Sequence, residues 1–334
     1  MPRNDFGDAM TNPVLPLQPS QATSKTIIRP PIDRLRGLLW KLAFATLVLM
    51  AIGSATRVAN AGLACPDWPL CYGKLVPAAE MNLQVFLEWF HRLDASLIGL
   101  MTLWLAVRSV QWRSQLPGWM TPVSILSLLL VIVQGGLGAL TVTELLRFEI
   151  VTAHLGTALL FFAVIVASAV ALLPHISQDV IKPFHSKIHW AGAIAAVLIY
   201  LQSLLGALVS SQWALHQCLG GLESLCRIMY NHLFGVIPPT LAVLVLVVWA
   251  WRLPHLHPLL HALAYSSGLL VLLQIGLGFA TFYLHLQVEP LTVAHQLIGA
   301  TLLGVLIGFF ILARRDCPVS IYHTHGHRES ASAH

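Results

Sequence analysis

The chain has 334 residues, of which 57% are hydrophobic and only 10% are charged, and its mean hydropathy is +0.75. Soluble domains carry about 25% charged residues, so this composition excludes a soluble protein and indicates an integral membrane protein. The formal net charge of +5 is spread along the chain rather than gathered in one basic block, which argues against nucleic-acid binding.

The chain opens with a polar, proline-containing segment, residues 1–34, that we predict to be a disordered cytoplasmic tail. It has no early apolar run, which argues against a cleavable signal peptide. Apolar runs of about 20 residues, the length needed to cross a bilayer, follow one another after it. We predict eight membrane-spanning helices, at residues 38–58, 84–107, 119–141, 150–173, 188–210, 229–251, 259–283 and 291–313.

An even number of spans places both termini on the same side of the membrane. Most Lys and Arg residues then fall on the side of the termini, which is the cytoplasmic side by the positive-inside rule. The exceptions on the outer side are Arg57, Lys74, Arg92, Arg147 and Arg227.

The two halves of the chain resemble each other. Residues 130–138 (Leu-Val-Ile-Val-Gln-Gly-Gly-Leu-Gly) match residues 270–278 (Leu-Val-Leu-Leu-Gln-Ile-Gly-Leu-Gly). Four helices per repeat leave both halves in the same orientation, unlike the inverted repeats of many transporters. We therefore predict an all-α membrane protein built as two pseudo-symmetric, parallel four-helix bundles. The bundles cover 35–173 and 188–313, with a cytoplasmic linker at 174–187 and a cytoplasmic C-terminal tail at 314–334.

Four histidines lie a few residues into alternate spans, those that run from the outer side inward. They are His91, His154, His232 and His295. The step from His91 to His154 equals the step from His232 to His295, so we expect all four imidazoles at a similar shallow depth. Two histidines on separate helices of one bundle suit axial ligation of a haem from both faces. The spacing predicts one haem site in each half.

Two alternatives compete with haem ligation. The first is a set of unrelated core histidines, hydrogen-bonded to backbone or hydroxyl groups. The second is a di-iron carboxylate site, whose Glu-x-x-His pattern is met by Glu88 and His91 but which needs a second such pair. The residues three before the other histidines are Val151, Met229 and Thr292, which excludes that site.

Glu88 lies three residues before His91 and four before Arg92, hence on the same helix face as both. An ionisable group within a membrane span is costly and indicates a functional site. One interpretation is an acid, base or charge-stabilising group beside the first haem pocket; the other is a local ion pair with Arg92. Since the second half has no counterpart, we predict that the first half does chemistry and the second stores or relays electrons.

Four of the five cysteines lie in outer loops, as the pairs Cys65 with Cys71 and Cys218 with Cys226. On an oxidising side of the membrane such pairs form disulfides or dithiol switches, or serve as structural staples. Cys317 is alone on the reducing side, and we assign it no role.

Four arginines gather at the outer boundary of the spans and are candidate partners for outward-pointing haem propionates. They are Arg57, Arg92, Arg147 and Arg227. Snorkelling of long basic side chains to the membrane interface explains the same positions without any ligand.

Three features together resemble the haem A synthase family, over residues 35–315. They are the loop Gly-Leu-Ala-Cys-Pro-Asp-Trp-Pro-Leu-Cys at 62–71, the Glu-Trp-Phe-His-Arg start of the second span, and the three later histidine segments. The resemblance implies a membrane enzyme of cytochrome oxidase assembly. It implies that haem O is converted to haem A by oxidation of the C8 methyl group to a formyl group.

The resemblance also implies roles for individual residues. These are His91 and His154 for the iron of the substrate haem, His232 and His295 for the iron of a permanent haem b, Glu88 with His91 and His154 for catalysis, and Cys65 and Cys71 for a redox-active pair. The pair Cys218 and Cys226 occurs in only part of the family. The expected setting is the bacterial inner membrane. The expected partners are haem O delivered by a haem O synthase, a periplasmic thiol or membrane electron carrier, the lipid bilayer and a second copy of the chain.

The alternative function is a dihaem electron-transfer cytochrome of the b type. It explains four histidines equally well but leaves Glu88 and the cysteine loop without a role. The two functions differ in pigment, because haem O or haem A marks the enzyme and haem b alone marks the carrier.

Overall fold

The computed structural model describes residues 30–175, 187–210, 223–284 and 288–316. Most of the predicted tails and linker, together with Cys218 and Cys317, lie outside these residues. The helices are α1 (Pro30–Val58), α2 (Leu83–Gln111), α3 (Met120–Thr143), α4 (Phe148–Ala171), α5 (Ile188–Val209), α7 (Glu223–Phe234), α8 (Ile237–Trp251), α9 (Pro258–Tyr283) and α10 (Glu289–Asp316).

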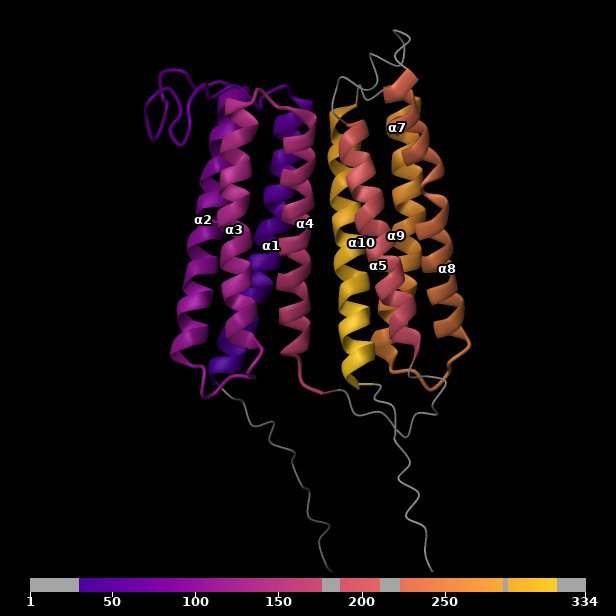
Figure 1. The fold of residues 1–334 in the computed structure, drawn as a ribbon. Coiled ribbons are helices and arrows are strands. Elements are labelled where there is room, and N and C mark those ends of the chain that lie inside the picture. Colours follow the sequence, from indigo (N-terminus) through magenta and orange to yellow (C-terminus); the bar gives the residue numbers. More distant parts are fainter. Residues whose placement is uncertain (1–29, 176–186, 211–222, 285–287, 317–334) are drawn as a thin grey trace, which may run out of the picture.

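Within the described residues, eight helical stretches are long and apolar enough to cross a membrane, which confirms the predicted all-α, multi-pass membrane fold. The predicted spans differ mainly at the ends of the chain, since α1 begins at Pro30, inside the predicted tail, and α10 continues to Asp316. Figure 1 shows the start of α1 and the end of α10 at the same end of the molecule. We call this the termini end. The opposite end, which carries the loop between α1 and α2, is the loop end.

The predicted span over 229–251 is confirmed as one membrane-crossing stretch, Arg227–Trp251, but α7 and α8 within it are separated at Gly235. Pro238 and Pro239 follow closely, and neither has an N–H group to donate to the preceding turn. A Cβ atom on Gly235 would collide with the main-chain oxygen four residues earlier, so the break requires glycine. The two helices still form one span, but His232 lies near the end of a short helix.

The helices pack as two rings. In the first ring α1 contacts α2, α2 contacts α3, α3 contacts α4, and α4 returns to α1. In the second ring α5, α8, α9 and α10 contact one another in the same cyclic order, and α7 lies against α5. The rings stand beside each other in Figure 1, and they meet where α10 contacts α1 and α4 and where α5 contacts α4. Alternate helices of each ring therefore stand diagonally across its centre.

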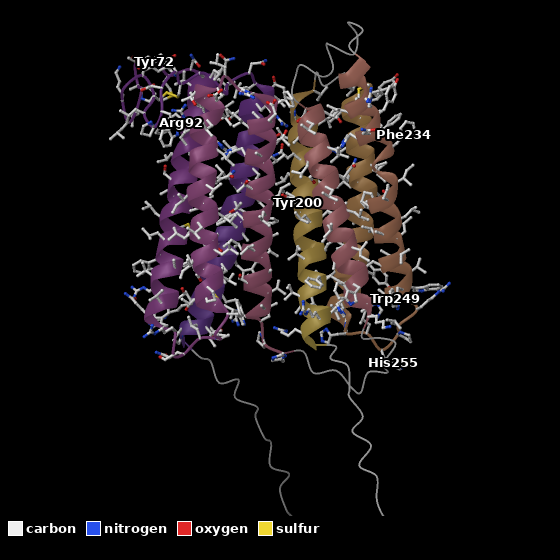
Figure 2. The ribbon with its side chains drawn as sticks, viewed as in Figure 1. Tyr72, Arg92, Tyr200, Phe234, Trp249 and His255 are labelled. Atoms are coloured by element: carbon white, nitrogen blue, oxygen red, sulfur yellow. A yellow bond between two sulfur atoms is a disulfide. The ribbon has the colours of Figure 1, made fainter. Side chains whose placement is uncertain are left out.

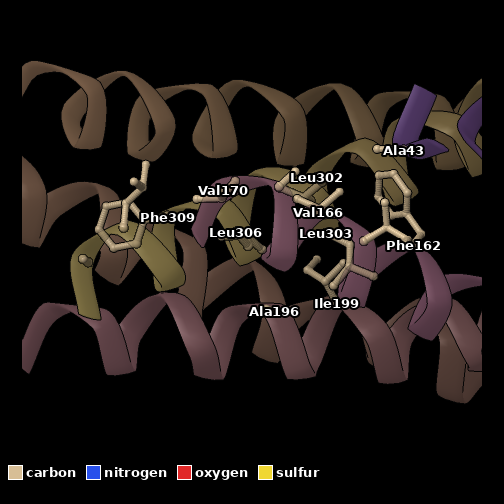
Figure 3. Close-up of a cluster of buried hydrophobic side chains, with 14 of the residues drawn as sticks. Ala43, Phe162, Val166, Val170, Ala196, Ile199, Leu302, Leu303, Leu306 and Phe309 are labelled. Carbon is tan, nitrogen blue, oxygen red and sulfur yellow. The ribbon is translucent and has the colours of Figure 1, made fainter. Parts of the chain in front are cut away.

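A dense part of the buried core lies where the two rings meet (Figure 3). Phe162 and Val166 of α4 and Leu303 and Leu306 of α10 are each 5% exposed or less in this cluster. Gly304 lets the two helices approach, since an added Cβ atom would lie 3.0 Å from the Phe162 ring. Lipid tails are as apolar as these side chains, so close packing rather than loss of water stabilises the contact.

Arginines from the first and last helices cap the C-terminal end of α4. Arg315 of α10 donates to the main-chain oxygen of Leu173 at 2.6 Å and to that of Pro174 at 3.0 Å. Arg36 of α1 donates to the main-chain oxygen of Leu172 at 3.2 Å. The last carbonyl groups of a helix lack partners within it and lie at the negative end of its dipole. Positive charge at this position therefore stabilises α4 and ties the rings together at the termini end.

Replacing Arg315 by Gln should destabilise the detergent-solubilised protein by about 1–3 kcal/mol, because charged hydrogen bonds to the end of α4 are lost. Arg314→Gln is the matched control, since Arg314 is the neighbouring residue and is exposed. Thermal unfolding of both variants measures the difference. Equal melting temperatures for the two variants would contradict the capping role of Arg315.

Candidate functional site

Each of the four histidines packs against a glycine on a neighbouring helix. The pairs are Gly53 with His91, Gly138 with His154, Gly206 with His232 and Gly278 with His295. A Cβ atom added to these glycines would lie 2.8, 3.4, 2.9 and 2.9 Å, respectively, from the Cε1 atom of the paired imidazole. We call these contacts the glycine cradles. Four different helix pairs thus build four similar surroundings for an imidazole.

The histidines of each half come from helices that stand diagonally across a ring. His91 lies on α2 and His154 on α4, which stand diagonally across the first ring. His232 on α7, which leads into α8, and His295 on α10 line one cavity of the second ring. The structure therefore brings the four histidines together as two pairs, one in each ring.

A cavity of about 330 Å³ lies inside the second ring, and both His232 and His295 line it. Its walls come from α5, α7, α8, α9 and α10, together with Leu155 and Leu159 of α4, and are mostly apolar. Its polar groups include the amides of Gln202 and Gln274 and the guanidinium group of Arg57. Cavities of this size class hold small ligands and cofactors. Two imidazoles from facing helices, each backed by a glycine, fit the axial ligation of a haem.

Glutamine side chains from neighbouring helices contact three of the histidines. The pairs are Gln134 with His154, Gln202 with His232 and Gln274 with His295. The first two amides donate to the main-chain oxygen of the histidine, at 2.9 and 2.7 Å. The second amide also lies 3.0 Å from the Nδ1 atom of its histidine, and the third lies 3.3 Å from the Nε2 atom. Such outer contacts orient a metal-binding imidazole.

Glu88 and Arg92 connect the helix turn of His91 to the loop above it. The Glu88 carboxylate, only 4% exposed, accepts a hydrogen bond from the N–H group of Cys65 at 2.7 Å. It also pairs with Arg92 at 2.5 Å, so the ion pair that was one interpretation of Glu88 is present. Arg92 in turn donates to three main-chain carbonyl groups of the loop, those of Cys65, Asp67 and Leu70. The pair fastens the loop to α2.

The loop is closed by a disulfide between Cys65 and Cys71, which confirms that this pair is a disulfide. The two residues are buried, with 0% and 2% of their surfaces exposed. Asp67 accepts hydrogen bonds from the N–H groups of Gly73 and Tyr72 at 2.7 and 2.6 Å, and these bonds hold the pKa of its carboxyl group below the usual value. Figure 2 shows this loop, with Tyr72, at the loop end of the first ring.

The second predicted cysteine pair, Cys218 with Cys226, stays a prediction. Cys218 lies outside the described residues, and for Cys226 the structure describes only its position in α7.

The four arginines predicted at the outer boundary have different surroundings. Arg57, in the last turn of α1, lines the cavity of the second ring and donates to the side-chain oxygen of Gln296 at 3.4 Å. Arg92 is bonded to the loop, Arg147 is exposed beside acidic neighbours, and Arg227 is exposed on α7. A residue of the first ring thus completes the cavity of the second.

The cradle glycines and the cross-ring position of Arg57 are not evident from hydropathy. A signal exists for Gly138 and Gly278, which close the two repeated segments four residues after a glutamine. The same Gln-x-x-x-Gly spacing recurs at Gln202 and Gly206. Small residues in membrane helices mark faces where a neighbouring helix approaches closely.

A family model described as COX15-CtaA, cytochrome oxidase assembly protein, matches residues 36–307. The haem A synthase of Bacillus pumilus is 26% identical over 295 residues, covering 81% of this chain and 92% of that protein. The haem A synthase of Shouchella clausii is 25% identical over 289 residues, covering 82% and 95%. A protohaem IX farnesyltransferase of Haloarcula marismortui is 35% identical over 108 residues, covering 32% of this chain and 22% of that protein. Since the family model matches most of its length, the chain belongs to the COX15-CtaA family of cytochrome oxidase assembly proteins.

Proposed function

We propose that this protein is a haem A synthase, which oxidises the C8 methyl group of haem O to a formyl group. One observation carries the proposal: of two cradled histidine pairs, the one in the first ring adjoins a buried carboxylate and a disulfide loop. Relatives named haem A synthase, matched over nearly their whole length, support the reaction. The relative named protohaem IX farnesyltransferase supports a farnesylated haem as substrate.

In this proposal haem O lies between His91 and His154, in the first bundle at 35–173. Glu88 shares the α2 face of His91 and is the candidate catalytic carboxylate. Its negative charge would stabilise positive charge that develops on the methyl carbon, or it would accept a proton. Each carboxylate oxygen has two lone pairs, so the bonds that Glu88 makes to the loop leave acceptor capacity for that proton.

The second bundle, 188–313, holds a haem b between His232 and His295. A bound haem b supplies one-electron transfer, and its potential depends on the axial ligands and on the dielectric around it. The apolar cavity wall would keep water from a bound haem, and the guanidinium group of Arg57 would be available to a propionate. In this proposal the first ring binds and oxidises the substrate, and the second ring transfers the electrons from the first site to the acceptor.

We place the protein in the bacterial inner membrane, with the termini end in the cytoplasm and the loop end in the periplasm. The arginines and lysines around the termini end support this orientation. A haem O synthase delivers the substrate, a membrane electron carrier accepts electrons, and a periplasmic thiol exchanges with the loop disulfide. Because Cys65 and Cys71 are buried, thiol exchange with their disulfide requires the loop to open. A second copy of the chain is a further candidate partner.

Co-expression with a haem O synthase should give purified protein that carries haem b together with haem O or haem A, identified by chromatography of the extracted pigments. His295→Ala should lose haem b, because an axial ligand is removed, and should keep haem O. His255→Ala is the matched control, since His255 is exposed at the termini end (Figure 2). Wild-type protein that holds haem b alone would favour the dihaem electron-transfer cytochrome.

Glu88→Gln keeps the size of the side chain and removes its charge. We expect folded protein that retains haem b, accumulates haem O and makes haem A about 100-fold more slowly, as is typical for loss of an acid–base group. Glu80→Gln is the control, because it removes another loop carboxylate that pairs with Lys74 at 2.7 Å. A wild-type yield of haem A per molecule would exclude a catalytic Glu88. Maleimide labelling of Cys65 and Cys71 reports separately whether the loop has come loose.

Arg57→Gln should weaken retention of haem b about tenfold, because a charge-assisted hydrogen bond to a propionate is lost. The measurement is haem b per protein after competition with apomyoglobin. Arg147→Gln, at an exposed position of the same boundary, should behave as wild type. Selective loss of haem O from the Arg57 variant would instead assign this arginine to the first site.

A further inference from the structure

The four glycine cradles differ at one neighbouring position. Four residues before the cradle glycine, one turn earlier on the same helix face, three helices carry glutamine and α1 carries leucine. The four residues are Leu49, Gln134, Gln202 and Gln274. Since the cradles themselves are alike, this position sets His91 apart from the other three histidines.

The glutamines act across the helix contact. Gln134 of α3 ties α4 at the level of His154, through the bond to its main-chain oxygen. Gln202 holds His232 through both the main chain and the ring, which fixes the helix and the imidazole together. A hydrogen bond of this kind restrains the position and the rotation of a ligand, and so opposes its departure from a metal.

Leu49 has no side-chain donor or acceptor. Within the described part of the chain, the Nδ1 atoms of the His91 and His154 rings both lack a hydrogen-bond partner, but Gln134 bonds the main-chain oxygen of His154 and no glutamine bonds His91. Helix α2 is held to the loop by Glu88, one turn before His91, and by Arg92, the residue after it, but neither side chain bonds the imidazole. At the level of His91 itself, α2 rests on α1 through the cradle contact with Gly53.

We propose that Leu49 makes His91 the exchangeable ligand of the first site, so that this site releases its haem while the second site retains its own. The inference rests on the proposed function, in which the first site turns over substrate and the second keeps a cofactor. On the α4 side Gln134 bonds the main chain at His154, whereas on the α2 side Leu49 offers His91 no such bond. Leu49 is a positioning residue in this scheme, because it acts through His91.

The test measures haem release from the whole purified chain. Protein co-expressed with a haem O synthase is mixed with excess apomyoglobin, and chromatography separates haem O and haem A, from the first site, from haem b. Leu49→Gln should slow release of haem O and haem A about fivefold, the effect of one net hydrogen bond. It should also raise the low-spin fraction of that haem and leave haem b release unchanged. Leu47→Gln, the same change on a different face of α1, is the matched control.

Two further variants keep the test decisive if Leu49→Gln does not fold. Gln134→Leu should speed release of haem O and haem A, and Gln274→Leu should speed release of haem b alone. Unchanged release of haem O and haem A from Leu49→Gln, or from Gln134→Leu, overturns the inference. Wild-type protein that carries neither haem O nor haem A overturns the proposed function itself, before any variant is compared.

Discussion

The contact between an imidazole and a bare glycine backbone is the constraint on which the rest of the structure depends. In a bilayer, helices associate through close packing rather than through loss of water, so small residues decide where backbones approach. A cradle glycine lets the histidine lie in the narrow space between two neighbouring helices. At Gly53, Gly206 and Gly278 an added Cβ atom would lie under 3.0 Å from the ring and would displace either the ring or the helix. The same histidine–glycine contact therefore recurs at four helix pairs, and it accompanies both the diagonal arrangement of the histidines and the closed helix rings.

The two halves share this frame and differ in what is attached to it at the loop end. In the first half, Glu88 and Arg92 use the start of α2 to hold a disulfide loop over the bundle. In the second half, the break at Gly235 places His232 at the end of a short helix beside an apolar cavity. Arg57 then crosses from α1 to complete that cavity. Neither half is complete without the other.

Much of this fold could be predicted from the sequence, because long apolar runs and a repeated segment indicate the position and length of each helix without knowledge of its neighbours. The spans, the four histidines and the cysteine pair of the loop follow from that information. The break before Pro238 could not be predicted in this way, because the apolar run continues through it. Hydropathy does not record that a proline lacks a backbone N–H group. The partners of Gly53 and Arg57 lie on other helices. Such contacts depend on how helices rotate and cross, which the pattern along one helix does not record.

The arginine cap on α4 has a consequence for biosynthesis. The ribosome completes α4 near the midpoint of the chain, yet Arg315, which bonds the carbonyl groups at the end of α4, belongs to α10, the last helix of the described residues. Among the described residues, Arg36 is the side chain that bonds those groups before α10 enters the membrane. The hydrogen bonds at the termini end of the first ring are therefore complete only after α10 has been inserted. Translation order makes the C-terminal helix the closing step of assembly for both halves.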